Sequence, residues 1–234
     1  MKYMKSKNKM KDLSKNARNI KKKYSLNEAI KFLKNQKKAK FIESVDVAVQ
    51  LAIDVKKMEQ NIRGSFAFPN GFEKKRKIAV FTSGRSAEKA KILGIKLIGM
   101  EDLAEKLVRK KNKFDLVIAS VESMKIVKKV SHIIGPRGLM PSLKTGTITE
   151  DIESCIKEVQ NGKAFYQNDK NGIVHSSVGK IDLDEKKIEE NIRFFLKHLI
   201  RSKPISAKGA YIKKLHISTT MGKSVEIDLS NLSC

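Results

Sequence analysis

After the first 24 residues, the spacing of apolar side chains is first that of a helix and then that of a strand. The segment SLNEAIKFLKN has Ser25 and Glu28 three residues apart, as a helix-capping box requires. Its apolar residues recur at helical spacing: Leu26, Ala29, Ile30 and Leu33. The segment ESVDVAVQLAI then alternates, which predicts a strand with a buried face made of Val45, Val47, Val49, Leu51 and Ile53. A second strand is predicted over 62–69, where a proline ends it.

From position 77, short apolar runs alternate with amphipathic segments. KIAVFTS, IKLIG and FDLVIAS have the composition of buried strands, whereas SAEKAKILG, EDLAEKLVRKKN and VESMKIVKKV have helical spacing. This alternation predicts right-handed crossovers and a parallel sheet covered by helices on both faces. The glycine pattern of a dinucleotide site is absent after all three strands. We therefore interpret this layer as a Rossmann-like body that holds no cofactor.

The last third of the chain returns to hairpins and helices. EDIESCIKEVQNG predicts a helix that acidic residues open and Gly162 ends. Two hairpins are predicted, in KAFYQNDKNGIVHSS with a turn at 169–172 and in AYIKKLHISTTMGKSVEIDL with a turn at 221–223. Between them, LDEKKIEENIRFFLKHLI predicts an amphipathic helix whose apolar face is Ile188, Ile192, Phe195, Leu196 and Leu199.

This order of elements predicts two domains, of α/β and α+β class. Residues 25–70 and 161–234 would form a split α+β sandwich domain from both chain ends. Residues 71–160 would form an inserted Rossmann-like, three-layer α/β domain, with the two chain crossings as a hinge. Residues 1–24 have too few apolar side chains for a core and predict a basic N-terminal arm.

The charge of the chain indicates a polyanionic partner. The 234 residues include 50 Lys and Arg against 25 Asp and Glu, a net charge of +25, which favours nucleic acid. Residues 71–160 carry 19 basic and 11 acidic side chains, and the rest of the chain carries 31 and 14. The split domain is therefore the stronger candidate surface. Lys outnumbers Arg by 42 to 8, so drift on solvated surfaces is an alternative source of part of this charge.

Membranes and the extracellular space are disfavoured. No stretch reaches the roughly 18 apolar residues of a membrane-spanning helix. The basic N-terminus has no apolar segment behind it, as a secretory signal would. Two cysteines, Cys155 and Cys234, are too few for a zinc site or a disulfide framework, which favours a reduced, intracellular protein.

The segment most like a catalytic motif is GPRGLMPSLKTGTIT, residues 135–149. In a phosphate-binding loop, Leu143 would have to be glycine, and Pro141 removes one amide donor. No nucleophile elbow occurs, and metal-ligand spacing is absent among His132, His175, His198 and His216. We therefore expect no enzyme activity, metal, cofactor or small-molecule substrate. A nucleotide-dependent enzyme built on the middle domain is the remote alternative.

Two short segments carry side chains that suit RNA. AKFIESVD places Lys40 and Phe41 at the start of the first long strand, with Ser44 and Asp46 on its polar face. STTMG, at the tip of the last hairpin, combines hydroxyls, a flexible thioether and a glycine that permits close approach. RNA is read through shape, 2′-hydroxyls and base edges, which such groups can contact. The structural alternative makes Phe41 a core residue and Met221 an ordinary turn residue.

Five segments, in order and spacing, resemble the bacterial type of the ribosomal protein L-one family. They are NIRGSFAFPNG, IIGPRGLMPSLKTGTIT, KAFYQNDKNGIVHSSVGK, NIRFFLKHL and STTMGKSVEID. The resemblance covers residues 25–228 and implies the two-domain fold and a monomer in the large ribosomal subunit. It implies binding of large-subunit ribosomal RNA at the mobile stalk, help in releasing deacylated tRNA from the exit site, and repression of the protein's own operon mRNA. The implied location is the cytoplasmic ribosome, or an organellar one; the alternative is a free RNA-binding translational repressor.

By this resemblance, the RNA-contacting residues lie in the split domain. They would be Lys40, Phe41, Ser44, Asp46, Thr219, Thr220, Met221 and Gly222, flanked by Asp169 and His175. A secondary RNA contact, or a loop facing the hinge, would be formed by Gly135, Pro136, Arg137, Gly138, Lys144 and Gly146. The chain departs from the family pattern in having Ser142 and Leu143 for Asn-Pro, Glu73 in a glycine-rich connection, and Asp46 for Glu.

Overall fold

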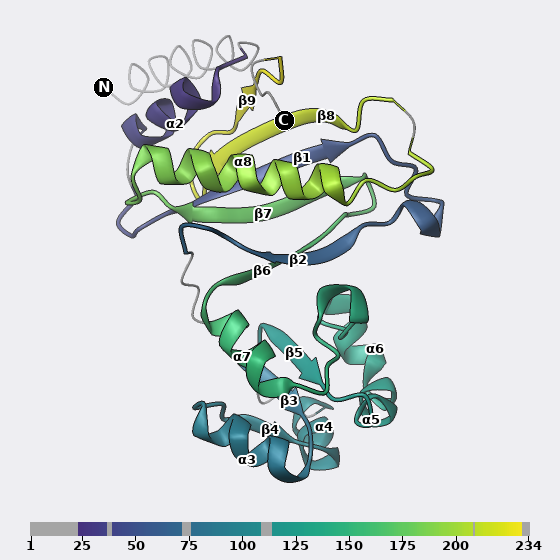
Figure 1. The fold of residues 1–234 in the computed structure, drawn as a ribbon. Helices are drawn as coiled ribbons and strands as arrows, with labels where there is room; N and C mark the ends of the chain where they lie inside the picture. Colours follow the sequence, from purple (N-terminus) through teal and green to yellow (C-terminus); the bar gives the residue numbers. More distant parts are fainter. Residues whose placement is uncertain (1–22, 37–38, 72–75, 109–113, 208, 231–234) are drawn as a thin grey trace, which may run out of the picture. The chain divides into compact units, whose positions relative to one another are not determined.

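The computed structural model describes residues 23–36, 39–71, 76–108, 114–207 and 209–230 (Figure 1). These residues fall into two compact units. The terminal unit contains the described residues up to Ile62, Phe68–Asn70 and those from Tyr166 on. The inserted unit contains Arg63–Ala67 and the described residues of Gly71–Phe165. All of the predicted basic arm except Lys23 and Tyr24, as well as Glu73, lies outside the described residues.

A four-stranded antiparallel sheet forms the centre of the terminal unit. Its order is β7 (Ile173–Lys180), β1 (Ser44–Leu51), β8 (Ile212–Thr219) and β9 (Val225–Ile227). The predicted alternation in β1 is confirmed, because Val45, Val47, Val49 and Leu51 are at most 2% exposed. Ile53 lies beyond the end of the strand and is only half-buried.

Two helices cover one face of this sheet, α2 (Leu26–Asn35) and α8 (Glu185–Arg201) (Figure 1). The capping box of α2 is present, with the Glu28 amide donating to Ser25 Oγ and the Ser25 amide donating to Glu28 Oε2. The predicted apolar face of α8 is at most 1% exposed. Burying each such side chain contributes roughly 1.5–3 kcal/mol. The side chains that alternate with the buried ones in β1 therefore point away from the helices.

The inserted unit contains a parallel sheet between two helical layers, as predicted. The sheet order is β4 (Leu97–Gly99), β3 (Ile78–Phe81) and β5 (Leu116–Ala119). One face packs against α3 (Gly84–Ile92) and α7 (Ile152–Gln160). The other packs against α4 (Glu101–Val108), α5 (Met124–Lys129) and α6 (Ser131–Ile134). The helix predicted over VESMKIVKKV starts only at Met124, because Ser120 and Ser123 hold the preceding residues in a turn.

The first predicted hairpin is partly wrong. Its turn exists, since the Asp169 amide donates to Ile173 O at 2.9 Å and Gly172 has a φ of 73°. The flanking strands, however, take other partners: β6 (Lys163–Gln167) pairs with β2 (Arg63–Ala67), and β7 pairs with β1. Alternation along one strand does not identify its partner, so only the register in space could show this. The second hairpin, β8 with β9, is confirmed.

Three short 3₁₀ helices complete the described elements: η1 (Met58–Gln60), η2 (Gly135–Arg137) and η3 (Leu143–Thr145). Within the part of the chain that the structure describes, no helix is long and apolar enough to cross a bilayer.

Candidate RNA interface

The tip of the β8–β9 hairpin is fixed to the beginning of β1. The Thr220 amide donates to Ser44 O at 3.2 Å, and the Ser44 amide donates to Thr220 Oγ1 at 3.0 Å. Val45 and Thr219 are paired in the ladder beside them. Two segments 176 residues apart in the sequence, which were both predicted to contact RNA, are thus brought together. The Thr220 hydroxyl therefore also has a structural role.

The same tip is packed against the C-terminal end of α2. Gln36, the C-cap residue of that helix, accepts the Lys223 amide through Oε1 at 3.0 Å. A Cβ on Gly222 would collide with Thr219 Oγ1 and would lie 2.6 Å from Gln36 Oε1. Gly222 is therefore required by close packing, because no larger residue leaves room for both neighbours. Thr219 itself is 3% exposed and does not present its side chain to solvent.

Three predicted residues around this tip are open to solvent. Lys40 is exposed, the Phe41 side chain is 55% exposed and the Met221 side chain is 74% exposed. The alternative that Phe41 is a core residue is therefore wrong. An exposed ring and a thioether can stack on or cover nucleobases, and the ammonium can pair with phosphate.

The uncovered face of the sheet is polar where β7, β1 and β8 run side by side. Asp46, which is half-buried, lies opposite Ser177 on one side and Ser218 on the other. Ala48, the next residue on that face, lies opposite His175 and His216. Sequence reasoning missed Ser177, Ser218 and His216. Alternation in the last hairpin could have placed Ser218 and His216 on a polar face, but only the strand register shows that Ser177 and Ser218 flank Asp46.

Asp169 and His175 lie at the far end of this polar face. Asp169 Oδ2 is 3.9 Å from His175 Nε2. Asp169 Oδ1 accepts the amides of Asn171 and Ile173, both at 2.8 Å. The carboxylate therefore builds the turn before β7, and the exposed His175 is the freer of the two for a ligand. His175 shares a face with Asp46 but lies roughly 13 Å along the sheet from the Ser44 end, at about 3.3 Å per residue.

The glycine-rich loop belongs to the inserted unit, and its backbone donors are used internally. The Gly138 amide donates to Gly135 O and the Gly146 amide to Leu143 O. The Ser142 amide donates to Thr147 Oγ1, and the Lys144 amide to Ser142 Oγ. Gly138 and Gly146 have φ of 69° and 66°, which explains the need for glycine there. A loop closed in this way offers no cradle of free amides for a phosphate.

The side chains of this loop are nevertheless accessible. Gly135, Pro136, Arg137, Gly138 and Lys144 are exposed, and Gly146 is half-buried. Neither Arg137 nor Lys144 forms an ion pair with another residue in the described ranges. Leu143, which departs from the family pattern, is 74% exposed.

The described residues show no metal-binding group. His, Cys, Asp and Glu side chains nowhere gather in threes within these ranges. Cys155 is buried, and this burial raises the pKa of its thiol, which disfavours the thiolate that metal binding needs. Its Sγ instead lies 3.4 Å from Gly146 O.

Comparison with known proteins finds a matching family model and similar proteins. The model of the Ribosomal protein L1p/L10e family matches residues 33–223. The large ribosomal subunit protein uL1 of Pseudoalteromonas atlantica is 49% identical over 212 residues, which is 91% of either chain. The family match includes residues of the hairpin tip, the polar face and the glycine-rich loop.

Proposed function

The chain belongs to the ribosomal protein L1p/L10e family, and on that premise we propose that it binds large-subunit ribosomal RNA at the mobile stalk through its terminal unit. The family consists of structural ribosomal proteins and not of enzymes. The protein is accordingly a component of the large subunit of the cytoplasmic ribosome.

The observation that carries this proposal is the docking of the β8–β9 tip on β1. It holds Thr220, Met221 and Gly222 beside the start of the strand that follows Lys40 and Phe41. Backbone, hydroxyl, thioether, ring and ammonium groups are thus presented together on a rigid support. Such groups suit the shape-dependent recognition of a folded RNA.

The proposal is tested by comparing two RNAs at two salt concentrations. One is the large-subunit stalk fragment, and the other is a shuffled duplex of equal length. We expect the stalk fragment to bind ~1000-fold more tightly and to keep this advantage as salt rises. If both RNAs bind alike and weaken together, only the net charge of +25 is acting and the proposal fails.

We propose two further roles for the same RNA-bound protein. The first is to assist the release of deacylated tRNA from the exit site, with the glycine-rich loop as a secondary RNA contact. Ribosomes lacking the protein should then release exit-site tRNA more slowly, and the Arg137→Ala, Lys144→Ala double variant should not restore the full rate. Unchanged release without the protein would contradict this role.

The second role is repression of the protein's own operon mRNA. The intact chain should repress translation of a reporter that carries the operon leader. If the leader and ribosomal RNA bind the same surface, the Met221→Ala variant should no longer repress it. A free repressor that never joins the ribosome is the alternative. Absence of the protein from large subunits after sedimentation at moderate salt would favour that alternative.

A further inference from the structure

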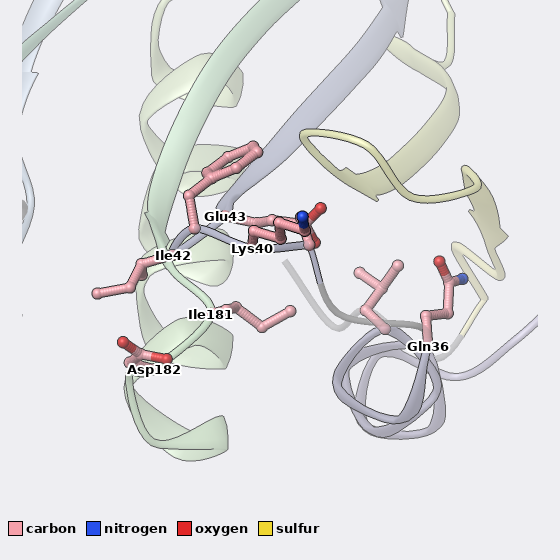
Figure 2. Close-up of a pocket in the computed structure, with 9 residues that line it drawn as sticks. Gln36, Lys40, Ile42, Glu43, Ile181 and Asp182 are labelled. Atoms are coloured by element: carbon pink, nitrogen blue, oxygen red, sulfur yellow. The ribbon is translucent and has the colours of Figure 1, made fainter.

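A pocket of about 250 Å³ lies between the end of α2 and the beginning of β1 (Figure 2). Apolar side chains line part of it, namely Leu33, Ile42 and Ile181. Lys40, Phe41 and Glu43 also line it. Lys40 and Phe41 thus belong both to this pocket and to the candidate RNA interface.

Glu43 is the unusual residue of the pocket. It is only 5% exposed, and its Oε1 atom is buried without a hydrogen-bond partner among the described residues. A buried carboxylate without a partner is costly, so such groups normally pair with a donor. The torsion that turns the two carboxylate oxygens is soft, so either oxygen can face the pocket. A donor that enters the pocket from outside would supply the missing partner.

The residues that line the pocket indicate what kind of molecule would carry that donor. Ile42 and Ile181 provide apolar contact, and Phe41 adds an exposed ring, which suits a flat molecule. The exposed Lys40 ammonium can donate to an acceptor on the same molecule. The ligand thus carries donors on one part of its edge and an acceptor on another.

We propose that the pocket receives an unpaired guanine of the bound RNA. This inference rests on the proposed function, because it names the base that the RNA interface recognises. Guanine offers two adjacent donors, N1–H and the 2-amino group, to the Glu43 carboxylate, and its O6 and N7 accept from Lys40. Adenine and cytosine present an acceptor where guanine presents N1–H, and uracil has a single donor between two acceptors. Glu43 therefore selects guanine, and Phe41 supplies the ring on which the base stacks.

The test uses three labelled pentanucleotide RNAs, UUGUU, UUIUU and UUAUU, and measures binding to the full chain by fluorescence anisotropy. Inosine lacks the 2-amino group and keeps N1–H. All three RNAs have the same charge, so the nonspecific contribution cancels in the comparison. We expect UUGUU to bind about tenfold or more tightly than UUAUU, with UUIUU in between.

Glu43→Gln should abolish the preference for UUGUU over UUAUU. The matched control is Asp182→Asn, which neutralises an exposed carboxylate that lines the same pocket and should keep the preference. Because Glu43→Gln could also disturb folding, Ile181→Trp serves as a second variant that fills the pocket and should likewise remove the preference. Circular dichroism establishes that each variant is folded.

The proposal is overturned if the wild-type chain binds the three pentanucleotides alike, or if folded Glu43→Gln or Ile181→Trp retains the preference for guanine. Failure of the proposed function looks different. In that case the wild-type chain does not discriminate the stalk fragment from the shuffled duplex, whatever its preference among pentanucleotides.

Discussion

Single atoms determine the shape of the hairpin tip. Thr219 Oγ1, Gln36 Oε1 and the missing side chain of Gly222 share one small space between β8, β9 and α2. The sequence predicted a glycine that permits close approach at this tip, and the close neighbours prove to be parts of the protein itself. It could not predict Gln36, because nothing in a sequence shows that a helix C-cap lies against a turn almost 190 residues later.

Gly222→Ala should disturb recognition more than folding. The added methyl group would collide with Thr219 Oγ1, so the tip must move away from β1 or α2. We expect the ratio of stalk-fragment to shuffled-duplex affinity to fall about tenfold, as for a loss near 1.4 kcal/mol. Ser224→Ala, an exposed change in the same hairpin, is the control and should leave the ratio intact. Full discrimination by Gly222→Ala would show that the tip is not the recognition surface.

Substitutions should show that Asp169 stabilises the fold and that His175 contributes to RNA binding. Asp169 Oδ1 accepts two backbone amides, so Asp169→Ala should lower the free energy of unfolding by about 2 kcal/mol in urea titration. His175 is exposed, so His175→Ala should change it by less than about 0.5 kcal/mol while weakening stalk RNA binding. Equal destabilisation by both changes would mean that the 3.9 Å contact between them matters more than the turn.

At the scale of elements, the periodicity of apolar residues predicted well whether a segment is a helix or a strand, but it predicted poorly which strands pair. β1 and α8 bury the residues that their spacing indicated, because each packs one face on a single core. The predicted hairpin of β6 with β7 was partly wrong, because its turn exists but both strands pair with strands distant in the chain. The same limit applies to the candidate site. The sequence named residues at the hairpin tip and the start of β1, but the position of Asp46 between Ser177 and Ser218 depends on strand register and was missed.

The capping box at the start of α2 should contribute measurably to stability. Ser25→Ala removes the acceptor of the Glu28 amide and should lower the free energy of unfolding by about 1 kcal/mol. Asn27→Ala, at an exposed position in the first turn of the helix, is the matched control and should have little effect. Since Gln36 at the other end of α2 holds the hairpin tip, Ser25→Ala should not alter RNA discrimination. A loss of discrimination would instead show that the whole helix positions the tip.

At the scale of the whole molecule, the net charge of +25 and the shaped surface of the terminal unit should make separable contributions to binding. A deletion in the basic N-terminal segment can separate these two contributions, and the structure indicates where the deletion should end. Tyr24 belongs to the fold, because its amide donates to Glu226 O at 3.1 Å and its ring stacks on Phe32 at 5.6 Å. A truncated chain should therefore begin at Lys23.

Deleting residues 1–22 should weaken the stalk fragment and the shuffled duplex by the same factor. The deletion removes eight Lys and one Arg against one Asp, so fewer counterions are released and affinity should depend less steeply on salt. The ratio of the two affinities should stay constant, because the hairpin tip and polar face remain. A control chain in which these Lys residues are changed to Gln should behave like the truncation. If either chain loses discrimination, the basic segment takes part in recognition, and charge and shape do not act independently in this protein.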